Sequence, residues 1–97
     1  MEVLNFTYPG DKIIEGRTHV GVVGSGDLEI LLEPSPDDMA HVRIRTSVEG
    51  YGPIWTKVLD RFFARYHGKV SIEINDFGAT PGMVSLRLQQ AVEETGK

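Results

Sequence analysis

A chain of 97 residues is the size of one domain, placed here over residues 1–97, and buries roughly 60–70 % of its unfolded surface. The formal net charge is −4 and no cluster of lysines and arginines is present to neutralise phosphates, which excludes a typical nucleic-acid-binding protein. The chain has no cysteine, which excludes disulfides, thiolate metal sites and an acyl-carrying thiol made by the chain itself. Thioester chemistry would therefore need a thiol that is brought in on a prosthetic group.

The N-terminal residues 1–5 lack the basic start and the apolar run of a signal peptide. No apolar stretch in the sequence approaches the length that spans a bilayer. These features predict a cytoplasmic protein that does not insert into membranes.

Three segments in the first third of the chain alternate apolar and polar residues, which is typical of half-buried strands. They cover residues 2–8, about 17–23 and about 27–33. Glycine and proline end the first segment and predict a loop that runs to about Gly16. The other two segments are separated only by Gly24-Ser25-Gly26-Asp27, which predicts a tight reversal between neighbouring strands.

A fourth strand is predicted over about 40–48, with Val42, Ile44 and Thr46 facing inward. Its outward residues are arginines, whereas the strand over 27–33 carries outward glutamates. Opposite charges across an antiparallel pair contribute a few tenths of a kcal/mol, up to about 1. The charge pattern therefore favours a hairpin between the third and the fourth strand.

Two helices and one more strand are predicted in the second half of the chain. A helix opens at residues 50–53, with proline in its first turn, carries a wide apolar stripe, and ends at His67-Gly68. A strand follows over about 69–75, and Thr80-Pro81 starts a second helix that runs out to Gly96. The predicted fold class is α+β: a two-layer sandwich with an antiparallel or mixed sheet of about five strands and two helices on one face.

Ser25 lies between two glycines at the reversal, where little bulk surrounds its hydroxyl. That hydroxyl is a candidate for the covalent attachment of a cofactor, with Gly24, Gly26 and Asp27 as the attachment loop. The alternative is that these four residues form only a hairpin turn, in which Asp27 bonds its own backbone.

Several other motifs in the sequence carry no chemistry. Asp76-Phe77-Gly78 matches a kinase magnesium motif, but a chain this short has no glycine-rich phosphate loop and no catalytic loop to accompany it. The serine is not in a nucleophile elbow, because Val23 and Asp27 stand where glycines belong. The three histidines have no ligand spacing, so neither a metal site nor a self-sufficient catalytic site is expected.

Three segments closely resemble the acyl carrier (delta) subunit of malonate decarboxylase, over nearly the whole chain. They are residues 22–29 around Ser25, residues 75–82, and residues 86–91. A more distant resemblance links the chain to the acyl carrier (gamma) subunit of citrate lyase, which also has a Ser-x-Asp before an apolar strand.

The resemblance implies that Ser25 carries 2′-(5″-phosphoribosyl)-3′-dephospho-coenzyme A through a phosphodiester bond, so that the chain is a phosphoprotein. It implies three partners: a prosthetic-group transferase, an acetyl/malonyl transferase subunit, and malonyl-thioester decarboxylase subunits. In the implied cycle of malonate catabolism, the acetylated thiol is exchanged to malonyl and then decarboxylated back to acetyl with release of CO2.

Two alternatives stay open beside this hypothesis. One is a small α+β module that binds a small ligand non-covalently or has a regulatory role, with the loop around Ser25 holding an anion. The other is the carrier subunit of citrate lyase, which would use the same cofactor with different partners. In all three hypotheses the chain itself contributes no catalytic residue. Residues 76–82 are a second candidate contact surface, with a helix cap as the alternative.

Overall fold

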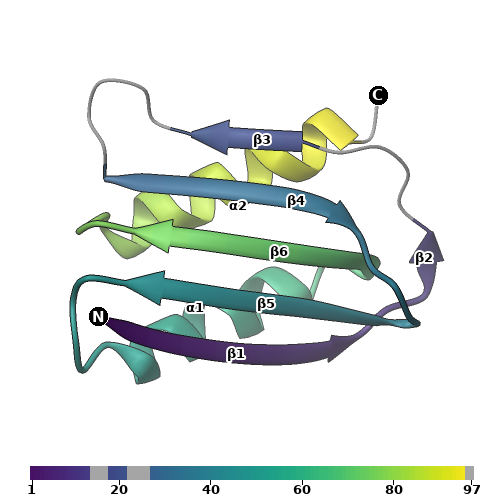
Figure 1. The fold of residues 1–97 in the computed structure, drawn as a ribbon. Coiled ribbons are helices and arrows are strands. Elements are labelled where there is room, and N and C mark those ends of the chain that lie inside the picture. The colour runs from purple at the N-terminus through teal and green to yellow at the C-terminus, as the bar shows by residue number, and fades with distance from the viewer. Residues whose placement is uncertain (14–17, 22–26, 96–97) are drawn as a thin grey trace.

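The computed structural model describes residues 1–13, 18–21 and 27–95. The strands are β1 (Glu2–Pro9), β2 (Lys12–Ile13), β3 (Thr18–Gly21), β4 (Leu28–Pro34), β5 (Met39–Thr46) and β6 (Gly68–Asp76). The helices are α1 (Gly52–Phe63) and α2 (Pro81–Thr95). Figure 1 shows both helices on the same side of the sheet, as the sequence predicted.

The sheet is mixed, with strand order β1-β5-β6-β4-β3 among the described residues. The β5–β6 pair is parallel, and the other neighbours along this order are antiparallel. Parallel neighbours need a crossover connection, and α1 provides it between β5 and β6. The predicted α+β class, mixed sheet and two-helix layer are therefore confirmed. The short strand β2, which pairs in parallel with the start of β6, was not predicted.

The predicted hairpin between the third and the fourth strand is wrong. β6 lies between β4 and β5, antiparallel to the first and parallel to the second. The predicted antiparallel direction is correct, but the two strands are not neighbours. Their outward charges meet residues of β6 instead: Arg43 lies opposite Glu73, and Asn75 Nδ2 donates to Glu29 Oε1 at 3.1 Å.

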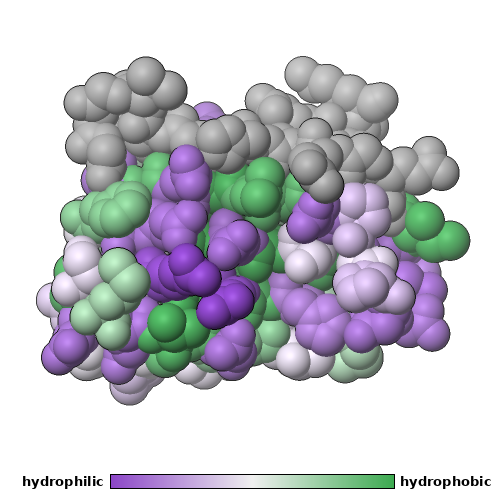
Figure 2. Space-filling model, viewed as in Figure 1, coloured by the Kyte–Doolittle hydropathy of each residue, from purple (hydrophilic) through white to green (hydrophobic). Residues whose placement is uncertain are grey.

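The core lies between the sheet and the two helices. Alternate residues of β4, β5 and β6 point into it, which is the consequence of the two-residue repeat of a strand. The fully buried large side chains are Ile30, Leu32, Val42, Ile44, Leu59, Val70, Ile72, Ile74, Val84 and Leu88, together with Thr46. The other face of the sheet, seen in Figure 2, is a mixture of hydrophilic and hydrophobic residues and carries the exposed Arg43 and Arg45.

The helix α1 buries one of the two apolar rows that the sequence offers. Trp55, Leu59 and Phe63 face the core, whereas Ile54 is 40 % exposed and Val58 only half-buried. The helix ends at Phe63, not at the predicted His67-Gly68. The chain then turns, with the N–H of Tyr66 donating to the carbonyl of Phe62, and Gly68 begins β6.

Gly68 leaves space for the phenol of Tyr66 at the start of β6. A Cβ built on Gly68 would contact the Tyr66 hydroxyl and lie 2.6 Å from Tyr66 Cζ. We expect Gly68→Ala to lower the free energy of unfolding by about 1–3 kcal/mol through this overpacking, measured by urea denaturation.

Gly82→Ala is the matched control for this substitution. A Cβ at Gly82, within α2, meets nothing within 4 Å, so alanine is expected to stabilise the helix by up to about 1 kcal/mol. Equal effects of the two substitutions would contradict the packing explanation.

Among the described residues, no helix is both long and apolar enough to cross a bilayer. The cytoplasmic location stays a prediction.

Candidate functional site

The predicted attachment loop joins β3 to β4 at one end of the sheet. β3 ends at Gly21, opposite Glu29 of β4, and β4 begins at Leu28. Ser25, Gly24 and Gly26 lie outside the described residues, so their predicted role is not tested by the structure. The fourth predicted residue, Asp27, is described and directly precedes β4. The end of the sheet at which β4 begins is called the Asp27 end (Figure 1).

Asp27 is tied to the segment that follows β6. Its carbonyl oxygen accepts a hydrogen bond from the N–H of Phe77 at 2.9 Å. Asp27 is half-buried, while Phe77 is 55 % exposed. The structure thus brings together the two regions that the sequence singled out, the attachment loop and residues 76–82, although they lie about fifty positions apart.

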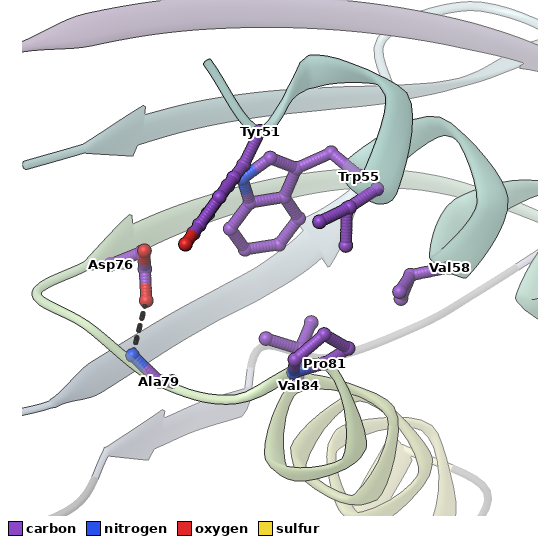
Figure 3. A pocket seen from close by; sticks show the side chains of 8 residues that line it. Tyr51, Trp55, Val58, Asp76, Ala79, Pro81 and Val84 are labelled. Carbon is purple, nitrogen blue, oxygen red and sulfur yellow. Dashed lines mark hydrogen bonds between the residues drawn. The ribbon is translucent and has the colours of Figure 1, made fainter. Parts of the chain in front are cut away.

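The buried carboxylate of Asp76 accepts the hydrogen bonds that hold the segment after β6 in place. The side chain is 4 % exposed, and Oδ2 accepts from the Thr46 hydroxyl at 2.8 Å. Oδ1 accepts from the N–H of Ala79 at 2.8 Å (Figure 3) and from the N–H of Gly78 at 3.3 Å. Gly78 has φ of +118°, a conformation that side-chain-bearing residues rarely adopt. The carboxylate therefore fixes a sharp turn at the end of β6, next to Asp27.

Thr80 caps the helix that follows this turn. Its hydroxyl oxygen accepts from the N–H of Met83 at 3.2 Å, and α2 begins at Pro81. The predicted helix start at Thr80-Pro81 is confirmed. This cap accounts for Thr80 and Pro81, whereas Phe77 and Gly78 remain exposed as possible contacts.

An apolar cavity of about 150 Å³ lies beside the same turn, between the N-terminal ends of α1 and α2. Figure 3 shows Tyr51 and Trp55 reaching into it from α1 and its N-cap, with Pro81 and Val84 of α2 across from them and Asp76 beside the end of the Tyr51 ring. Trp55 belongs to the buried row of α1 and is 5 % exposed. The cavity was not predicted, because its walls come from segments that meet only in the fold.

The comparisons with known proteins identify the family. Residues 15–95 match the family described as malonate decarboxylase delta subunit (MdcD). The chain is 50 % identical over 97 residues to the malonate decarboxylase acyl carrier protein of Pseudomonas aeruginosa strain PAO1, covering 99 % of this chain and 98 % of that one.

This chain belongs to the malonate decarboxylase delta subunit family.

Two further relatives of this delta subunit support the same family assignment. The malonate decarboxylase acyl carrier protein of Azotobacter vinelandii is 46 % identical over 95 residues, covering 97 % of this chain and 96 % of that one. A chain in a crystal structure of a Pseudomonas malonate decarboxylase hetero-tetramer in complex with malonate superposes with a TM-score of 0.90 at 45 % identity, covering 98 % of this chain and 99 % of that chain. The resemblance inferred from the sequence is confirmed.

The histidines of this delta subunit whose side chains are described lie apart from the Asp27 end. His41 Nε2 lies 2.9 Å from Asp37 Oδ1, in the connection between β4 and β5. The pKa of Asp37 is lowered by the hydrogen bond from the backbone N–H of Met39 and, less strongly, by the hydrogen bond with the His41 side chain. His67 lies near Asp11, with 3.9 Å between Nδ1 and Oδ2. Neither histidine contacts residues 76–82 or Asp27 through a described hydrogen bond.

Proposed function

We propose that the chain is the acyl carrier subunit of a malonate decarboxylase, with Ser25 as the covalent attachment point of 2′-(5″-phosphoribosyl)-3′-dephospho-coenzyme A. The observation that carries this proposal is 50 % identity over the whole chain to a malonate decarboxylase acyl carrier protein, in a sequence with no cysteine. An acyl carrier without a thiol needs one from a bound group.

The described residues beside the attachment loop are compatible with a prosthetic group that a modifying enzyme attaches. Asp27 is only half-buried, and Phe77 and Gly78 beside it are exposed, so the surface at this end is open to a modifying enzyme. Two hydrogen bonds from Gly78 and Ala79 to Asp76 stabilise the turn that carries Phe77 and Gly78. When bound, the group supplies the thiol that carries acetyl and malonyl groups as thioesters.

The proposed role of this chain is to bind and present, while its partners catalyse. A prosthetic-group transferase modifies Ser25, an acetyl/malonyl transferase subunit exchanges the acyl group, and malonyl-thioester decarboxylase subunits release CO2. Tethering keeps the acyl group at a high effective concentration near both catalytic subunits. The Asp27 end must therefore face each partner in turn.

The proposal is tested by the intact mass of the full chain produced together with its prosthetic-group transferase. We expect an adduct with the mass of phosphoribosyl-dephospho-coenzyme A joined by a phosphodiester, and peptide fragmentation should place it on Ser25. An unmodified chain in a catalytically active complex would refute the proposal. Co-purification with malonyl-thioester decarboxylase subunits, and not with the citrate lyase subunits, separates the two carriers.

A further inference from the structure

A continuous groove runs between α1 and α2 on the solvent side of the helix layer. The apolar cavity beside Trp55 shares Ile54, Val58 and Pro81 with a hollow of about 290 Å³. That hollow shares Val58, Arg61 and Ser85 with a larger one of about 600 Å³. Because neighbouring hollows share their walls, we treat them as one surface and call it the helix groove.

One wall of the helix groove is cationic. Lys57, Arg61 and Arg65 follow one another at intervals of four residues, so they form one row along α1. All three are exposed, and none makes an ion pair with a carboxylate of the described residues. The nearby carboxylate of Asp60 accepts instead from the Tyr8 hydroxyl at 2.7 Å.

The other walls of the two larger hollows are apolar or neutral. Val58 and Phe62 form a half-buried row beside the cations, and α2 contributes the uncharged Ser85 and Gln89. No carboxylate lines the two larger hollows among the described residues. Unpaired cations beside apolar side chains, on a chain of net charge −4, fit an anionic amphipathic partner.

The position of the groove indicates which kind of partner binds there. Its narrow end is the cavity lined by Asp76, and the next residue, Phe77, is bonded to Asp27. A protein seated in the groove therefore lies near Asp27, the described residue of the attachment loop, which is two positions from Ser25 in the sequence. A catalytic subunit has to approach that loop, whereas a second copy of the chain has no such need.

We propose that the helix groove is the docking site for a catalytic subunit of the decarboxylase complex. The partner lays an amphipathic segment along α1, with its carboxylates toward Lys57, Arg61 and Arg65 and its apolar side chains toward Val58 and Phe62. This inference rests on the proposed carrier function and specifies the surface through which that function operates.

The test compares two variants that each remove two positive charges. Arg61→Gln/Arg65→Gln neutralises the groove, and Arg43→Gln/Arg45→Gln neutralises the exposed arginines on the opposite face of the sheet. Affinity of the full-length modified chain for the isolated transferase subunit and for the decarboxylase subunits is measured at low and high salt. For at least one subunit, we expect the groove variant to bind about tenfold more weakly and with less salt dependence, and the sheet variant to bind within about twofold of the unsubstituted chain.

Each other outcome overturns the inference. Equal affinities of the two variants show that the groove is not the docking site, while adduct formation on Ser25 still upholds the carrier function. A groove variant that changes only self-association, seen by sedimentation, assigns the groove to a second copy. Tighter binding of coenzyme A to the unsubstituted chain than to the groove variant, with unchanged subunit affinity, assigns it to a nucleotide. If the unsubstituted, modified chain binds no catalytic subunit, both the inference and the proposed function fail.

Discussion

Replacing Ser25 with alanine is expected to abolish covalent modification of the chain while leaving it folded. The substitution removes one hydroxyl oxygen and nothing else, and no cysteine is present to take over the attachment. We expect the adduct to disappear from the intact-mass spectrum. Malonate decarboxylation by the reconstituted complex should fall to the level of a complex without this chain. The free energy of unfolding should change by no more than about 0.5 kcal/mol.

Ser47→Ala is the matched control for this experiment. Ser47 is an exposed serine that directly follows β5, and its N–H donates to the carbonyl of Asp76, at the same end of the sheet. A modifying enzyme that recognised any accessible hydroxyl of the chain would also use Ser47. Full modification of Ser47→Ala is expected, and an adduct that persists on Ser25→Ala would disprove the assignment.

The second large effect is expected at Asp76, which we predict to be the most sensitive polar position of the described chain. Asp76→Ala leaves the N–H groups of Gly78 and Ala79 without their acceptor, in a site where Asp76 is 4 % exposed. The Thr46 hydroxyl loses its shorter hydrogen bond and keeps only the Val48 carbonyl, 3.3 Å away. A buried donor without a partner costs about 1–3 kcal/mol. Because relaxation and water relieve part of the loss, we expect the free energy of unfolding to fall by about 3 kcal/mol in total, measured by urea denaturation.

Two further variants separate this hydrogen-bond explanation from a general effect of charge. Asp76→Asn keeps one acceptor oxygen, so it should lose less stability than Asp76→Ala. Asp38→Ala removes an exposed carboxylate whose ion pair with Lys69 spans 3.1 Å, and its effect should stay within about 1 kcal/mol. In Asp76→Ala, the amide protons of Gly78 and Ala79 should also exchange faster with solvent. Equal losses in Asp76→Ala and Asp38→Ala would contradict the explanation.

Most of the secondary structure follows from local patterns in the sequence. The strict alternation in residues 69–75 and the Thr80-Pro81 pair fix β6 and the start of α2, because both signals depend only on neighbouring residues. The pairing partner of each strand does not follow from such local patterns. Alternation tells which face of β4 is buried, but it is silent about which strand pairs with it, and β6 takes the place that the glutamates and arginines had suggested for β5.

The candidate site, too, could be predicted from the sequence only in part. The sequence singled out Ser25, Asp27 and residues 76–82, and the hydrogen bond between Phe77 and Asp27 shows that two of these regions meet. The role of Asp76 could not be predicted, because its strongest side-chain partner, Thr46, lies thirty positions away. The cationic row on α1 is visible in the sequence at intervals of four, but its significance depends on the uncharged wall that α2 places opposite it.

The central place of β6 in the sheet has a consequence for biosynthesis. Its residues are made after those of every other strand, so a nascent chain that has not reached Asp76 holds β4 and β5 with no strand between them. Such a chain exposes two open edges, each ready to pair with another molecule. Ribosome-bound intermediates that stall before this point should therefore depend on chaperones, and release of the last thirty residues should end that dependence.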